Sequence, residues 1–157
     1  MASVVRAADA ERLAGGSIEL LVQTDSVASN RAVLRAGSAG VPPHFHAQSS
    51  EVFLVLAGSL EALVDEEVVT LGEGDVLVVE PSTVHALAPA GDRDAAIFVV
   101  TTPAADRFDY YRLLDRVQRG DAGPEELTAA QDRFDSYFVD SPAWNDRAST
   151  NGGTACA

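Results

Sequence analysis

Short apolar runs separated by turn residues fill the middle of the chain. Between residue 18 and about residue 100 the runs are rich in Val, Ile, Leu and Ala, and Gly, Pro and Asp stand between them. This spacing predicts antiparallel β-strands, because a parallel sheet would need helical crossovers for which the connections are too short. The expected strands are residues 18–22, 31–35, 51–57, 59–64, 67–71, 75–80 and 95–100. We therefore expect an all-β sandwich or barrel, with tight hairpins around Gly58 and at Asp65–Glu66.

The last third of the chain has helical periodicity instead. Its apolar side chains recur every three or four residues at Phe108, Tyr111, Leu114 and Val117. They predict a helix over residues 107–119, and a second helix should start at Pro124 and continue to Phe138. The strand at 51–57 is apolar on both faces, so its outer face must be covered. We expect the two helices to cover it, or a second copy of the chain to do so.

A length of 157 residues is enough for one domain with extensions. We divide the chain into an N-terminal arm (1–17), a barrel (18–103), a helical extension (104–140) and a tail (141–157). The tail is expected to be largely disordered, because it ends in the polar run STNGGTACA. Its single cysteine, Cys156, excludes an internal disulfide and a cysteine-based zinc site.

Charge excludes several classes of partner. The chain has 24 acidic and 11 basic residues, all of the latter Arg, and a formal net charge of −13. A negative field repels phosphate backbones and anionic lipids, so we expect neither nucleic acid nor a membrane as partner. No apolar run approaches the ~18 residues of a membrane span, and charges interrupt the first residues where a secretion signal would be apolar. We therefore expect a cytoplasmic protein.

The three histidines lie in a pattern typical of metal ligands. His44 and His46 are two residues apart, so both point to one face of an extended strand. Glu51 follows five residues later, and His85 follows the turn before another strand. A single histidine on a strand is more often a structural residue than a ligand. Three imidazoles and one carboxylate together suit a first-row transition metal.

Two stretches around these residues resemble the sequence motifs of the cupin superfamily. Residues 40–58, GVPPHFHAQSSEVFLVLAG, contain a glycine, HxH, four residues, Glu, six residues and Gly. Residues 74–85, GDVLVVEPSTVH, contain a Gly-Asp turn, a short strand, Pro and a final His. The chain departs from the family pattern at Ser82, where cupins have Gly, and at Pro89, where they have Asn.

The resemblance implies a fold and a set of ligands. The fold would be a single cupin jelly-roll barrel with C-terminal helices. By the same resemblance His44, His46, Glu51 and His85 would bind a divalent metal, which could be Fe, Mn, Ni, Co or Zn. Cupins commonly dimerise through their sheets, so the resemblance also implies a homodimer.

Strand alternation predicts an apolar surrounding for the metal. Phe53 and Val55 share the face of Glu51, and Leu87 shares the face of His85, so these residues would line a substrate pocket or simply form the core. No inward Arg or Lys is apparent near the ligands, which argues against sugar phosphates. A flat aromatic or polyketide-like substrate fits this environment better.

Three functions stay open at this point. Such a metal carries a local charge of about +1 with two open positions, which favours an enolate, and Glu51 could accept a proton. The run IFVVTTPAADRFDYYRLL resembles small quercetin-dioxygenase-like cupins, which implies dioxygenation of an enolisable substrate. The chain is also similar to cupin polyketide cyclases, which need no O₂ but use four histidines where this chain has three. The third function is a barrel that binds a small molecule without catalysis.

Overall fold

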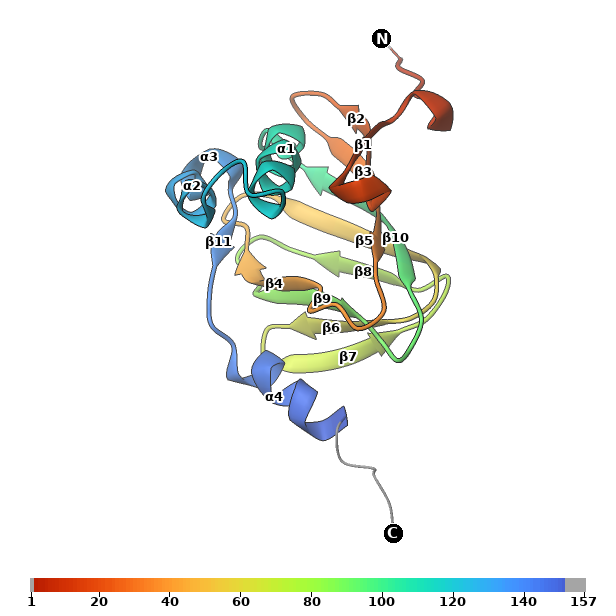
Figure 1. Cartoon of the computed structure of the whole chain (residues 1–157), viewed down its shortest axis with the longest axis vertical. Helices are drawn as coiled ribbons and strands as arrows, with labels where there is room; N and C mark the ends of the chain where they lie inside the picture. The colour runs from red at the N-terminus through yellow and green to blue at the C-terminus, as the bar shows by residue number, and fades with distance from the viewer. Residues whose placement is uncertain (1, 152–157) are drawn as a thin grey trace.

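The computed structural model describes residues 2–151 as two antiparallel sheets that face each other (Figure 1). The larger sheet has the strand order β1 (Glu11–Leu13), β2 (Ile18–Gln23), β3 (Ala28–Leu34), β10 (Ala95–Thr102), β5 (Ser50–Ala57), β8 (Val76–Val79). The smaller has the order β11 (Tyr137–Phe138), β4 (Val41–Phe45), β9 (His85–Pro89), β6 (Leu60–Val64), β7 (Glu67–Leu71). This arrangement confirms the expected all-β barrel.

The core lies between the two sheets. On β5 the buried residues alternate as strand geometry requires, and Glu51, Phe53 and Val55 face inward. The apolar side chains that fill the interior come from both sheets: Phe53, Val55, Leu60, Ala62, Val79, Leu87, Ala95, Ile97 and Val99. Glu51 lies in register with Thr101 of β10 and Val79 of β8, so its carboxylate is buried inside the barrel.

One of the two expected hairpins forms and the other does not. Val64 pairs with Glu67, so Asp65 and Glu66 form the two-residue turn between β6 and β7. The hairpin around Gly58 was a wrong prediction, because β5 and β6 belong to different sheets. Gly58 has a φ of 74°, and a Cβ there would collide with the Asp94 carbonyl oxygen. The glycine therefore lets the chain that leaves β5 pass close to the backbone at the start of β10.

The C-terminal helices partly match the prediction. Helix α1 (Arg107–Gln118) forms as expected. The second helix does not reach Phe138. It is divided into α2 (Pro124–Ala129) and α3 (Gln131–Phe134), and Asp135 then adopts a left-handed φ of 48°. The chain continues as β11, which pairs with β4 through Tyr137–Phe45 and Phe138–His44. Pairing with the edge of β4 therefore replaces the last helical turns.

The outer face of β5 is not covered by these helices, contrary to expectation. Helix α1 contacts β1 and β2, which lie at the opposite edge of the larger sheet from β5 and β8. Leu56 of β5 is exposed, and so are Val76 and Val78 of the neighbouring strand β8. The reason is that α1–α3 gather at one end of the barrel (Figure 1).

The two ends of the chain carry additional structure. In the N-terminal arm, η1 (Ala7–Asp9) and η2 (Ala14–Gly16) flank β1, which extends the larger sheet. In the segment expected to be largely disordered, residues 142–151 form α4 (Pro142–Asn151). Its Trp144 is buried against Leu63, Ala86 and Ala88. Residues 152–157, including Cys156, lie outside the described residues. Among residues 2–151 no helix is both long and apolar enough to cross a membrane.

Candidate metal centre

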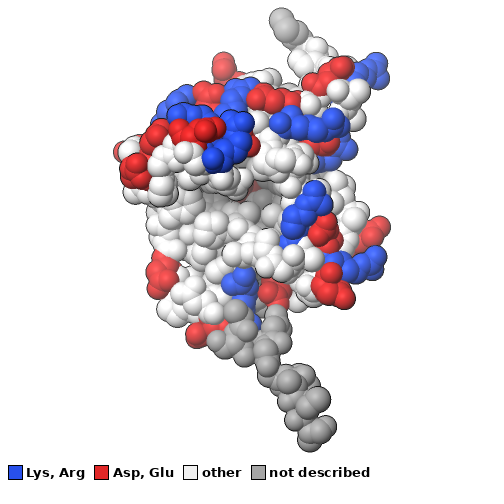
Figure 2. All heavy atoms as spheres, viewed as in Figure 1, with Lys and Arg blue, Asp and Glu red and all other residues white. Residues whose placement is uncertain are grey.

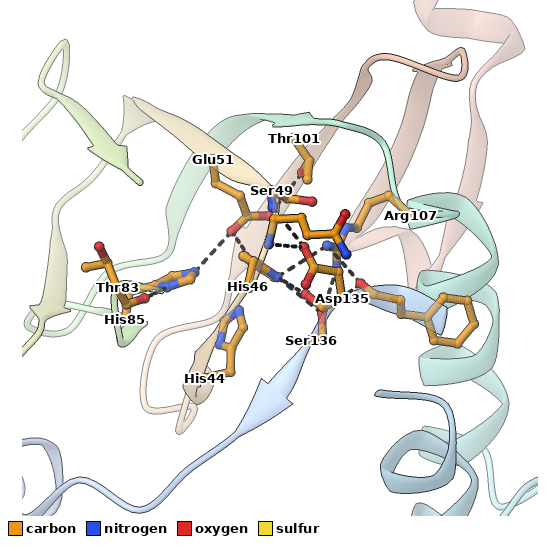
Figure 3. Close-up of polar contacts among 12 residues, drawn as sticks. His44, His46, Ser49, Glu51, Thr83, His85, Thr101, Arg107, Asp135 and Ser136 are labelled. Atoms are coloured by element: carbon orange, nitrogen blue, oxygen red, sulfur yellow. Dashed lines mark hydrogen bonds and ion pairs between the residues drawn. The ribbon is translucent and has the colours of Figure 1, made fainter. Parts of the chain in front are cut away.

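The four predicted ligands come together inside one end of the barrel. His44 lies on β4, His46 directly follows β4, Glu51 lies on β5, and His85 begins β9. All four are buried, and one nitrogen or oxygen atom from each lies within 4.8 Å of the others. His44 and His85 are register partners on neighbouring strands, while Glu51 faces them from the opposite sheet (Figure 3). The cluster therefore joins the two sheets.

Backbone carbonyl groups fix the orientation of all three imidazoles. His44 Nδ1 lies 2.9 Å from the carbonyl oxygen of Pro42, and His85 Nδ1 lies 3.0 Å from that of Thr83. His46 Nδ1 contacts the carbonyl oxygen of Asp135. A carbonyl oxygen only accepts, so each Nδ1 carries the proton and each neutral ring keeps a lone pair on Nε2. This is the tautomer that a metal ligand requires.

The remaining atoms of the cluster call for a cation. Glu51 Oε2 lies 3.1 Å from Nε2 of His46 and 3.1 Å from Nε2 of His85. Each of these contacts needs either a proton on the histidine Nε2 or a cation between the two atoms, and His46 Nε2 is otherwise buried without a hydrogen-bond partner. A divalent metal between these atoms would bind all of them at once. The donor set of His44, His46, Glu51 and His85 thus fits a metal.

Electrostatics keeps the ligands in the protonation states that bind metal. Burial, aided by the neighbouring His85 and His46, lowers the pKa of His44 to about 3. Burial acts to raise the pKa of Glu51, but its contacts with His46 and His85 outweigh burial and hold that pKa well below its ordinary value. The Thr101 hydroxyl also donates to Glu51 Oε1 at 3.0 Å. At neutral pH, His44 is neutral and Glu51 is a carboxylate.

Asp135 braces the loop between two ligands. Its carboxylate accepts hydrogen bonds from the backbone N–H groups of Ala47, Gln48 and Ser49 at 2.7, 3.0 and 2.8 Å. The same residue supplies the carbonyl oxygen that holds His46 (Figure 3). Burial acts to raise the pKa of Asp135, but the backbone hydrogen bonds have the larger effect, so the pKa is lower than its ordinary value. The segment from α3 to β11 is therefore part of the site, which the sequence did not indicate.

A buried arginine lies next to the ligands, contrary to expectation. Arg107, the first residue of α1, donates to Ser136 Oγ at 3.0 Å and to the Phe134 carbonyl oxygen at 3.3 Å. Its Nη2 lies 3.5 Å from His46 Nδ1 (Figure 3). The expectation that no inward Arg lies near the ligands was wrong, because α1 starts beside the site rather than on the outer face of β5. The charge argument against sugar phosphates falls with it.

The apolar residues predicted around the metal are buried as expected. Phe53, Val55 and Leu87 belong to the core, and the Phe53 ring lies 6.1 Å from the His85 ring. Phe138, expected on a helix, instead lies on β11 with its ring 6.2 Å from that of His44. Contact of these residues with a substrate stays a prediction.

The exterior around the helices differs from this interior. Charged side chains gather over α1–α3, whereas the barrel below them is largely uncharged in this view (Figure 2). A cavity of about 450 Å³ lies between α1 and the following helices and is lined by residues such as Arg112, Arg116 and Glu126. None of the four ligands lines it, so this cavity is distinct from the candidate metal centre.

The family comparison agrees with the motif and the geometry. A family model described as the Cupin domain matches residues 30–101, a range that contains all four ligands. This protein carries a cupin domain. Asp135 and Arg107, which contact His46 and its loop, lie beyond the matched range.

Solved structures show the same fold. KdgF from Halomonas sp. superposes with a TM-score of 0.61 at 18% identity, covering 69% of this chain and 99% of the other. An RmlC-like cupin from Shewanella frigidimarina gives a TM-score of 0.60 at 20% identity, covering 69% and 96%. An uncharacterized protein with a double-stranded β-helix domain from Klebsiella pneumoniae gives a TM-score of 0.55 at 18% identity, covering 66% of this chain and 91% of the other. At these identities the likeness is one of fold. A search of curated proteins gave no match.

Proposed function

We propose that this cupin is a metal-dependent enzyme that acts on an enolisable, aromatic or polyketide-like small molecule by dioxygenation. The observation that carries the proposal is the cluster itself, in which three imidazoles held through Nδ1 and one ionised carboxylate converge within 4.8 Å. A buried carboxylate against three histidines is costly in an apolar barrel unless a cation compensates it. The expected metal is Fe, Mn, Ni, Co or Zn.

The ligand set favours an oxygen chelate. When bound, the metal would supply Lewis acidity that lowers the pKa of an enol and activates it toward oxidation. His44, His46, Glu51 and His85 occupy four positions, so an octahedral ion keeps two for substrate. Phe53 and Leu87 would exclude water beside these positions and pack against a flat ring.

Glu51 is the candidate proton acceptor. Thr101 holds its Oε1 by a hydrogen bond, while Oε2 faces the two Nε2 atoms. Rotation of the carboxylate about the Thr101 hydrogen bond would free Oε2 to take the enol proton when substrate arrives. The lowered pKa of Glu51 ensures that the carboxylate is ionised before substrate binds.

The experiment is turnover of flavonols and 1,3-diketones by protein reconstituted with each metal, with and without O₂. The proposal predicts consumption of substrate and O₂ together. Glu51→Gln should keep most of the metal but lose about 10²–10⁴-fold in turnover. The exposed Glu80→Gln is the matched control. Equal turnover without O₂ would replace dioxygenation by cyclisation, binding without turnover would leave a binding protein, and absence of bound metal would overturn the proposal.

We also propose that the chain forms a homodimer through the outer face of the larger sheet. Val76 and Val78 on β8 are 57% and 59% exposed, and their register partners on β5 are Leu54 and Val52. A contiguous apolar face of this kind is typical of an interface, and a second copy offers the matching apolar surface.

A further inference from the structure

Some buried polar groups near the metal centre have no partner. Four buried side-chain nitrogen atoms in the described part of the chain lack a hydrogen bond: Asn30 Nδ2, Arg31 Nε, His46 Nε2 and Arg107 Nε. Arg31 Nε lies 3.0 Å from Glu19 Oε2 in an ion pair, and His46 Nε2 faces the metal position. Asn30 and Arg107, each 2% exposed, stay unexplained. A buried donor without an acceptor costs about 1–3 kcal/mol, so a site that retains two of them suggests a ligand.

Asn30 faces the interior one row from the metal ligands. It pairs with Val99 of β10, and Val99 pairs with Phe53 of β5, all three residues being buried. In the adjacent inward row Thr101 pairs with Glu51. Residues in neighbouring rows of one sheet face lie within reach of a small ligand. The Asn30 amide and the Glu51 carboxylate therefore border the same part of the barrel.

Arg107 approaches this region from α1. Its hydrogen bonds to Ser136 and Phe134 use both terminal nitrogens and fix the guanidinium, and its Nε–H has no acceptor. No carboxylate of the described residues lies within 4.0 Å of this guanidinium in an ion pair. A buried cation without such a partner attracts an anion strongly.

Tyr111 links the two orphaned donors. It follows Arg107 by four residues, which places both side chains on the same side of α1. The Tyr111 hydroxyl lies close to the Asn30 side chain, although not in a geometry that satisfies Asn30 Nδ2, and it is within electrostatic reach of both Glu51 and Arg107. Burial raises its pKa, so the hydroxyl keeps its proton and can donate.

We propose that Asn30, Tyr111 and Arg107 form an anion-binding subsite, which holds a carboxylate of the substrate at a distance from the atoms that chelate the metal. The proposal rests on the proposed function, since it assigns the second attachment point of the same substrate. It makes the substrate an anionic enol with a separate carboxylate, whereas metal chelation alone would accept a neutral enol. The three residues are specificity-determining residues.

A matched pair of probes tests this subsite. The probes are 3-hydroxypyran-4-one and its 6-carboxylate, which share one hydroxy-ketone chelate and differ by a remote carboxylate. Their Kd values are measured by titration calorimetry on metal-loaded protein. Wild type should bind the carboxylate at least about tenfold more tightly. Asn30→Ala should bring the ratio close to one and leave the affinity for the neutral probe unchanged, and Arg107→Met should lower the ratio in the same direction.

The controls separate this proposal from the metal proposal. Arg112→Met removes the same charge from an exposed position of α1 and should keep the tenfold preference. If wild type binds no metal, the proposed function fails. If wild type binds metal but has no preference for the carboxylate, or if Asn30→Ala keeps the preference, the subsite is refuted. Asn30→Ala decides the matter even where Arg107→Met disturbs His46 and loses metal.

Discussion

Asp135 holds His46 by its carbonyl oxygen, although 89 positions separate the two residues in the chain. The carboxylate of Asp135 also binds the backbone of the loop that leads from His46 to Glu51. A C-terminal segment outside the matched cupin domain thus orients one metal ligand and the approach to another. Loss of the hydrogen-bond partner of a metal-binding histidine typically lowers metal affinity about 10–100-fold.

Removal of the Asp135 carboxylate should weaken metal binding. Asp135→Ala leaves three N–H groups of the loop without their acceptor, one of them on the buried Ser49, so we expect metal affinity to fall about 10–100-fold and stability to fall by about 1–3 kcal/mol. Competition with a chelator and chemical denaturation measure the two effects. Asp132→Ala, which removes an exposed carboxylate bonded to Tyr137, should change neither much. Unchanged metal affinity in Asp135→Ala would show that the brace has no role in the site.

Gly40 should be required for the approach of β4 to β9. It has a φ of 72°, and a Cβ there would collide with the Leu87 carbonyl oxygen. Gly37 has a similar φ of 75° with nothing near its missing side chain. Gly37→Ala should therefore cost only the left-handed strain of about 1–2 kcal/mol, and Gly40→Ala should cost clearly more in urea denaturation. Equal losses would mean that the backbone relaxes around Gly40 without penalty.

Acid should destabilise the metal-free protein over a defined range. The folded-state pKa of His44 is about 3 and its ordinary value is 6.5, so the unfolded chain binds the extra proton between these values. Stability therefore rises with pH across this window and is lost as pH falls from 6.5 toward 3, at up to about 1.4 kcal/mol per pH unit for this group. Glu51, whose pKa is also lowered, adds to the loss below about pH 4.5.

Unfolding of wild type and His44→Gln at several pH values measures this effect. The glutamine cannot take up the proton, so the variant should have the shallower slope between pH 6.5 and 4.5. Parallel slopes in the two proteins would contradict the neutral, buried state of His44.

If the proposed dimer forms, carboxylates introduced into its interface should lower the mass of the particle in solution. Wild type should have twice the chain mass of 16.5 kDa in light scattering. The double variant Val76→Glu and Val78→Glu places four carboxylates in the symmetric interface and should give 16.5 kDa. Val4→Glu, at another exposed valine, should stay dimeric. A wild-type mass of one chain would refute the dimer.

The ligands could be predicted from sequence because their spacing is local. His44 and His46 alternate on one strand, and the two motifs place Glu51 and His85 at known strand ends. The barrel followed from the same short-range pattern of apolar runs. The hairpin at Asp65–Glu66 is local in the same sense, since two residues close it.

The supporting residues could not be predicted because their contacts are long-range. Arg107 and Asp135 reach His46 across 61 and 89 positions, and neither type of residue forms a motif with its partner. The apolar residues up to Phe138 have helical spacing. The helix nevertheless ends before Asp135, whose side chain makes tertiary contacts, and the following residues pair with β4 as strand β11. The sequence around Gly58 is typical of a hairpin turn. Whether a hairpin forms there depends on which sheet each flanking strand joins, and β5 and β6 join different sheets.

Metal content tests the central claim most directly. Wild-type protein, purified without added chelator and analysed by elemental mass spectrometry, should carry about one first-row metal ion per chain or take one up on titration. His85→Ala, which removes one of the four ligands, should bind less than a tenth as much at the same free metal concentration, while remaining folded by circular dichroism. A wild-type protein that takes up no ion, or a folded His85→Ala that binds as much as wild type, would contradict the account.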